Sequence, residues 1–200
     1  MAEVAHGVLL PTQQHGCRSH SWWAVVVLLC VDASIFASFG FAHLHVSMAA
    51  DICPPPGAAT PAWGWPAGAM ALLLLGSAVL ETARRRFARA ERQTVVRAAT
   101  VLAMACAAAA LALEAVGHQN AGLAPTADAW SATVAALLGW QGLHIAIVLL
   151  MGSYLLARSL SDHLRPRARA TLDNTVLFWH YVTVQGLVGS ALVQGLPMLM

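Results

Sequence analysis

Five apolar runs dominate this chain, and each is long enough to cross a bilayer, which takes about 20 residues of helix. Hydrophobic residues make up 58% of the sequence and charged residues only 10%, whereas a water-soluble domain carries about 25% charged residues. In lipid, backbone polar groups must bond within the protein, so only helices or closed barrels span it. Because the runs are continuous rather than alternating, they predict an all-α integral membrane bundle of five transmembrane helices. The predicted spans are 22–48, 65–83, 94–116, 130–157 and 175–197.

The arginines indicate how these spans are oriented. All eleven basic residues are arginine, with six in residues 84–97 and four in 158–169. The alternate loops, 49–64 and 117–129, contain none. Because short cytoplasmic loops are enriched in basic residues, we expect the N-terminus to be cytoplasmic and the C-terminus to be periplasmic.

The chain is expected to form a single membrane domain over residues 1–200, with an N-terminal cytoplasmic segment at 1–21 and the bundle at 22–197. The segment has no basic stretch followed by an apolar one, so a cleaved signal peptide is not expected. A net charge of +2 favours neither nucleic acid nor an acidic substrate. The four cysteines form no CxxC pair, which disfavours zinc, attached haem and a redox dithiol.

Ionisable side chains inside a membrane are costly, so each one within the spans is a candidate site. Asp32 lies about 15 Å along the first span, near the midplane. The others are Glu114 near the outer end of the third span, His144 near the middle of the fourth, and His180 in the inner half of the fifth. Two interpretations of Asp32 stay open: a proton-linked or lipid-contacting acid, or a neutral acid that hydrogen-bonds a neighbouring helix.

The histidines allow several interpretations. A haem b site needs two imidazoles at one depth on facing helices. His180 is expected about 10 Å deeper than His144, and His45 lies near the opposite surface, so no pair is evident. The alternative is hydrogen bonding between helices. Metal binding by His43 and His45 is disfavoured, because residues two apart on a helix point about 200° apart.

Four segments, in order, resemble subunit III of the haem-copper oxidases. "VDASIFASFGFAHLH" (31–45) is similar to the first helix of the short, five-span form, where an acid is followed by phenylalanines and then a histidine. "LALEAV" (111–116) fits the glutamate of the middle helix, and "GWQGLHIAI" (139–147) resembles a Gly-Phe-His-Gly-Leu-His-Val motif. "LFWHYV" (177–182) resembles the aromatic-Trp-His-Phe signature of the last helix, and Asp173 matches an acid just ahead of it.

The chain departs from the family pattern in two of these helices. Gln141 replaces the first histidine of the two-histidine motif. In the last helix, Thr183 and Gln185 replace an acid and an aliphatic residue, and Gly186 stands where the family has tryptophan. The subtype is left open: cytochrome c oxidase, quinol oxidase, or the related accessory protein of nitric oxide reductase. A stand-alone haem b protein and an Asp32-based proton transporter are further alternatives, although the two halves show no internal repeat.

The resemblance implies a subunit of an enzyme complex, in a bacterial cytoplasmic membrane, with no catalytic centre, metal or haem of its own. Subunit I, in complex with subunit II, would carry the redox chemistry. Subunit III would hold phospholipid and support proton uptake, with Asp32 as the buried acid near the subunit interface. The implied interhelical polar positions are His45, Glu114, His144 and His180. The implied lipid-binding candidates are Asp173, Arg158, Arg165 and Arg167.

Overall fold

The computed structural model describes residues 4–5, 8–9, 20–50, 52–56, 58–90, 92–161, 164 and 169–199. Five long helices lie among them: α1 (His20–Ala49), α2 (Gly64–Ala90), α3 (Gln93–Asn120), α4 (Ala129–Leu160) and α5 (Ala170–Leu199). In the N-terminal segment, β1 (Val4–Ala5) pairs antiparallel with β2 (Val8–Leu9). All five helices are long and apolar enough to cross a membrane, so the predicted five-helix membrane bundle is confirmed.

Each helix contains its predicted span and continues past it at both ends. The apolar run marks only the part that fits the hydrocarbon, whereas polar residues prolong the helix where water and headgroups are available. α2 carries its arginines in these added turns. α4 begins at a capping residue, because Asp128 accepts a hydrogen bond from the backbone N–H of Ser131 at 2.7 Å.

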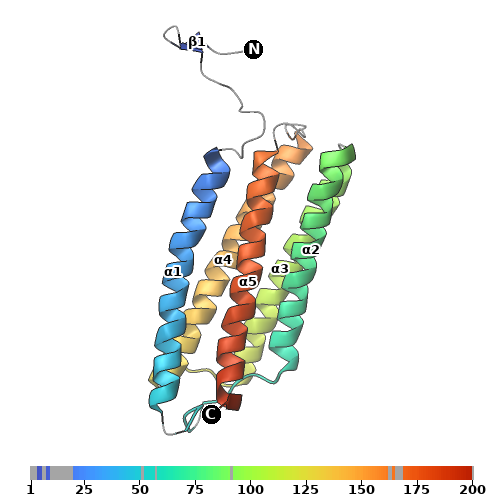
Figure 1. Cartoon of the computed structure of the whole chain (residues 1–200). Helices are drawn as coiled ribbons and strands as arrows, with labels where there is room; N and C mark the ends of the chain where they lie inside the picture. The colour runs from blue at the N-terminus through green and yellow to red at the C-terminus, as the bar shows by residue number, and fades with distance from the viewer. Residues whose placement is uncertain are drawn as a thin grey trace.

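The helices form two layers. In Figure 1, α1, α5 and α2 stand in front, and α4 and α3 lie behind them. α5 packs against α1, α2 and α4, while α3 packs against α2 and α4. α1 also packs against α4 but hardly touches α2. The face of α5 between α1 and α2 is therefore left uncovered by a helix.

Successive helices run antiparallel, and this gathers the arginine-rich segments at one end of the bundle. The end of α2, the start of α3, the end of α4 and the start of α5 lie there together, next to the start of α1 (Figure 1). The C-terminus lies at the opposite end. We call the arginine-rich half the inner half and the other the outer half; which of them faces the cytoplasm stays a prediction.

Two apolar clusters hold the bundle together. The larger one runs along α2, α3, α4 and α5, with Phe87 and Trp179 among its largest buried side chains. The smaller one surrounds Trp130 in the outer half and includes Phe36 and Phe39 of α1. α1 is the least covered helix, since only Leu29, Gly40, His43 and Ser47 are buried in it.

Candidate functional site

Asp32, His144 and Tyr181 form a polar cluster where α1, α4 and α5 meet. His144 Nε2 lies 3.0 Å from Asp32 Oδ1, and the Tyr181 hydroxyl donates a hydrogen bond to Asp32 Oδ2. The ring of Phe178 stacks on His144, with centroids 6.0 Å apart. The side chain of His144 is 4% exposed and that of Asp32 is 15% exposed. The structure therefore brings together two of the predicted site residues and adds Tyr181, which the sequence did not single out.

The hydrogen bonds of His144 limit the forms that this pair of side chains can take. Its Nδ1 lies 2.7 Å from the carbonyl oxygen of Trp140. A carbonyl only accepts, so Nδ1 carries a hydrogen. Nε2 then either accepts from protonated Asp32 or, in the imidazolium form, donates to the Asp32 carboxylate. In both forms the His144–Asp32 pair is neutral overall and shares one proton, which suits a membrane interior.

His43, rather than His45, makes the interhelical hydrogen bond at the outer end of α1. His43 is fully buried, and its Nδ1 lies 2.9 Å from the Thr133 hydroxyl of α4. The Thr133 hydroxyl itself donates to the Trp130 carbonyl at 2.8 Å, so it accepts from His43. His45 is exposed. Among the described residues, no group of three or more His, Cys, Asp and Glu side chains is arranged to hold a metal ion.

Helical spacing distinguishes the two histidines and was the missed signal. At about 100° per residue, His43 falls roughly 20° from the direction of Asp32, with Phe36 and Phe39 between them on the same face. His45 falls roughly 220° away. The face that carries Asp32 is the one that packs on α4 and α5, so it is His43 that becomes buried.

His180 contacts α2 instead of the Asp32 cluster. Its Nδ1 lies 2.5 Å from the Ser77 hydroxyl, and its Nε2 lies 3.6 Å from Glu81. Its neighbour Tyr181 packs on the ring of His144, with centroids 6.2 Å apart. The expected depth difference of about 10 Å between His180 and His144 is therefore wrong. The expectation assumed that the midpoints of the fourth and fifth apolar runs lie at one level in the membrane, and in the bundle they do not.

An ion-pair network ties α2 to α5 in the inner half. Glu81 pairs with Arg84 at 2.8 Å and with Arg85 at 2.6 Å. Asp173 pairs with Arg84 at 3.4 Å and with Arg169 at 3.2 Å. Three guanidinium groups thus face two carboxylates, which leaves an excess of one positive charge. Asp173 therefore holds two arginines in place at the start of α5.

Two open grooves border this region. The first, which we call the front groove, lies on α5 between α1 and α2 and has a volume of about 600 Å³. Its lining includes Trp22, Arg84, Arg85 and His180. The second lies at the inner ends of α1, α4 and α5, with Arg158 in its lining and a volume of about 490 Å³. The other predicted lipid-binding residues, Arg165 and Arg167, lie outside the described residues.

A family model described as cytochrome c oxidase subunit III matches residues 6–189 of the chain. The chain belongs to the cytochrome c oxidase subunit III family. Its fold, five apolar helices of membrane-spanning length, agrees with a multi-pass membrane subunit. No curated protein matches the sequence.

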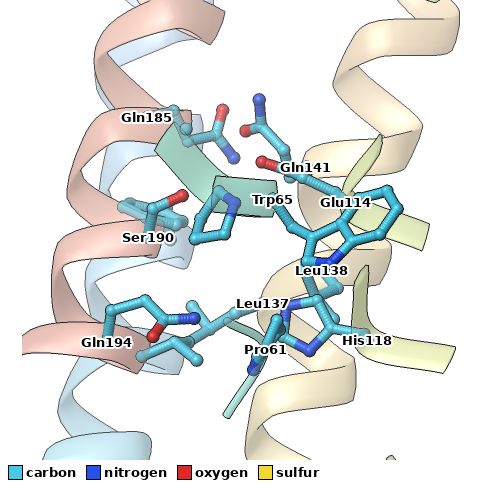
Figure 2. Close-up of a pocket in the computed structure, with 15 residues that line it drawn as sticks. Pro61, Trp65, Glu114, His118, Leu137, Leu138, Gln141, Gln185, Ser190 and Gln194 are labelled. Atoms are coloured by element: carbon cyan, nitrogen blue, oxygen red, sulfur yellow. The ribbon is translucent and has the colours of Figure 1, made fainter. Parts of the chain in front are cut away.

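In this subunit III, three of the departures from the family pattern lie together. Gln141, Gln185 and Gly186 line one cavity in the outer half, and Glu114 of α3 lines it too (Figure 2). A side chain at position 186 would begin 2.7 Å from Gln141 Nε2, so the glycine leaves room for that amide. The fourth departure, Thr183, donates to the Trp179 carbonyl at 2.9 Å and does not line the cavity.

Proposed function

We propose that this chain is the non-redox subunit III of a bacterial haem-copper terminal oxidase. In this role it lies in the cytoplasmic membrane, with its arginine-rich half inside, and packs beside the catalytic subunit I in complex with subunit II. It carries no haem or copper, binds phospholipid and supports proton uptake. Membership of the subunit III family supports assembly with other oxidase subunits.

The observation that carries the proposal is the contact between His144 Nε2 and Asp32 Oδ1 at 3.0 Å, across which the two groups can share a proton. The Tyr181 hydroxyl and the Trp140 carbonyl fix the orientation of the two groups, and the net charge of the pair stays the same when a proton moves from one to the other. Asp32 keeps 15% of its side chain exposed, so the pair reaches the surface of the bundle. A proton held at that surface is available to a subunit packed on α1.

α1 is the surface that we assign to subunit I. It has only four buried residues in its length, fewer than α3 or α4. Large apolar side chains cover the remainder, and Asp32 lies at the edge of this face. The exposed ones are Trp23, Val27, Leu28, Val31, Ile35, Phe41 and Met48. Contact with subunit I would shield the Asp32 cluster from lipid.

The front groove is the proposed phospholipid site. Arg85 lies at its inner rim with 70% of its side chain exposed, and the ion-pair network there has a net positive charge. Guanidinium groups match phosphate oxygens in geometry and charge. Below the rim, Leu74, Val184 and Leu187 line the groove, which suits acyl chains. An anionic phospholipid would therefore place its headgroup near Arg85 and its chains along α5.

Co-purification from native membranes tests the assignment. A tag on this chain should recover subunits I and II, identified by mass, together with the absorption bands of their haems. Recovery with a nitric oxide reductase would replace the oxidase assignment by its alternative within the same family. Recovery of the chain without any redox partner, under conditions that keep other respiratory complexes intact, would contradict the proposal.

A further inference from the structure

The cavity in the outer half is lined by residues from all five helices or the segments next to them. Phe36 comes from α1, Pro61 and Trp65 from the start of α2 and the loop before it, and Leu137 and Leu138 from α4. Its polar lining consists of six side chains. These are Glu114 and His118 of α3, Gln141 of α4, and Gln185, Ser190 and Gln194 of α5. Figure 2 shows the amides of Gln141 and Gln185 pointing toward one another, with Glu114 beside them.

The three glutamines need hydrogen-bond partners that the described residues do not supply. They are 3 to 5% exposed. Gln141 donates to the Val182 carbonyl at 3.3 Å, but its Oε1 has no partner within the described part of the chain. The same holds for both amide atoms of Gln185 and for Nε2 of Gln194. Buried polar groups without partners are rare in native proteins, and ordered water commonly satisfies them.

The cavity has the size for water. The space open to the centres of water molecules is about 30 Å³. One water needs about 10 to 15 Å³ of such space together with two to four polar partners, so roughly two waters fit. The donors and acceptors of the three amides face this space. An acyl chain would leave these groups without partners, so water suits the cavity better than lipid.

We propose that the outer cavity holds a small water cluster that bridges the three glutamine amides to Glu114, and that Glu114 exchanges its proton through this water. Glu114 and His118 are the two titratable side chains in the lining. They lie four residues apart on one face of α3. His118 is one turn closer to the outer end of the bundle, so it provides the step between Glu114 and the outer solution. This site is separate from the Asp32 cluster.

Gly186 makes room for the cavity. A Cβ there would lie 2.7 Å from Gln141 Nε2 and 3.0 Å from Leu73 Cδ1. The amides of Gln141 and Gln185 make the space polar, which is why we place water here rather than an empty gap.

A density map of the purified complex, at a resolution that shows ordered waters, tests the first half of the proposal. We expect density within hydrogen-bonding distance of the Gln185 amide and of Gln141 Oε1. An empty cavity, or density continuous with an acyl chain, would overturn the water site. The outcome does not depend on which oxidase or reductase the chain serves.

Infrared spectroscopy of the same complex tests the proton exchange. The carboxyl band of Glu114, assigned by its loss in Glu114→Gln, should shift in D₂O or appear on acidification. Gln185→Leu should slow this response several-fold by removing the bridging amide. Gln119→Leu is the matched control, because Gln119 is exposed and does not line the cavity. The exchange would be overturned if the Glu114 band responds neither to D₂O nor to acidification. It would also be overturned if the band responds as fast in a folded Gln185→Leu variant as in the parent protein.

Discussion

Replacing Asp32 by asparagine and by alanine separates its proton from its hydrogen bonds. The asparagine amide still accepts from the Tyr181 hydroxyl and still donates to His144 Nε2, because His144 Nδ1–H remains bonded to the Trp140 carbonyl. Alanine removes both bonds. A hydrogen bond between transmembrane helices contributes about 0.6 kcal/mol on average and about 1.7 at most. Asp32→Ala should therefore lose roughly 1 to 3 kcal/mol, whereas Asp32→Asn should stay within about 0.5 kcal/mol of the parent.

Two measurements on these variants test the cluster. Detergent-induced unfolding, followed by helical circular dichroism, reports the stability difference. A loss of this size leaves the bundle folded under native conditions, so the number of turnovers before the complex inactivates can also be measured. We expect both variants to shorten that lifetime, because neither can share a proton with His144. A native lifetime in Asp32→Asn would refute the proton role. Equal stability of the two variants would refute the hydrogen-bond geometry.

Two further predictions concern packing and lipid. Gly117→Ala should destabilise the bundle by about 1 to 3 kcal/mol, since the new Cβ would lie 2.7 Å from Trp65 Cβ. The control in the same unfolding assay is Gly139→Ala, whose new Cβ would meet no neighbouring side chain or helix within 4 Å. Equal losses of stability in the two variants would contradict the packing at Gly117. Arg85→Gln should reduce the amount of anionic phospholipid that the complex retains in native mass spectrometry. The control is Arg89→Gln, because Arg89 is exposed and lies outside the front groove, and it should leave the retained phospholipid unchanged. Equal retention in both variants would count against the site.

The sequence was sufficient for the architecture because the bilayer imposes a strict rule on it. A run of about 20 apolar residues has one stable form in lipid, so the five helices followed from hydropathy. Family membership was also predictable, since the motifs around Asp32, His144 and His180 are local in the sequence and keep their order. The grouping of arginines in alternate loops likewise predicted that they would share one end of the bundle.

The sequence was less informative about which polar residues meet. The choice between His43 and His45 was available in principle from helical spacing, but it needed the face of α1 that packs on α4. The level of Tyr181 against His144 depends on how α4 and α5 are offset along the membrane normal. That offset is set by side-chain packing over the whole length of both helices, and no short motif encodes it.

By itself, the amino-acid sequence determined that this protein is a five-helix membrane bundle of the subunit III type, because chain hydrophobicity and local motifs carry that information. Only the tertiary structure brought Asp32 within hydrogen-bonding distance of His144 and gathered Gln141, Gln185 and Gly186 around one cavity. The physical reason is that burial in lipid acts on each helix separately, whereas hydrogen bonds between helices depend on their rotation and offset. Those two quantities are fixed only when all five helices have packed.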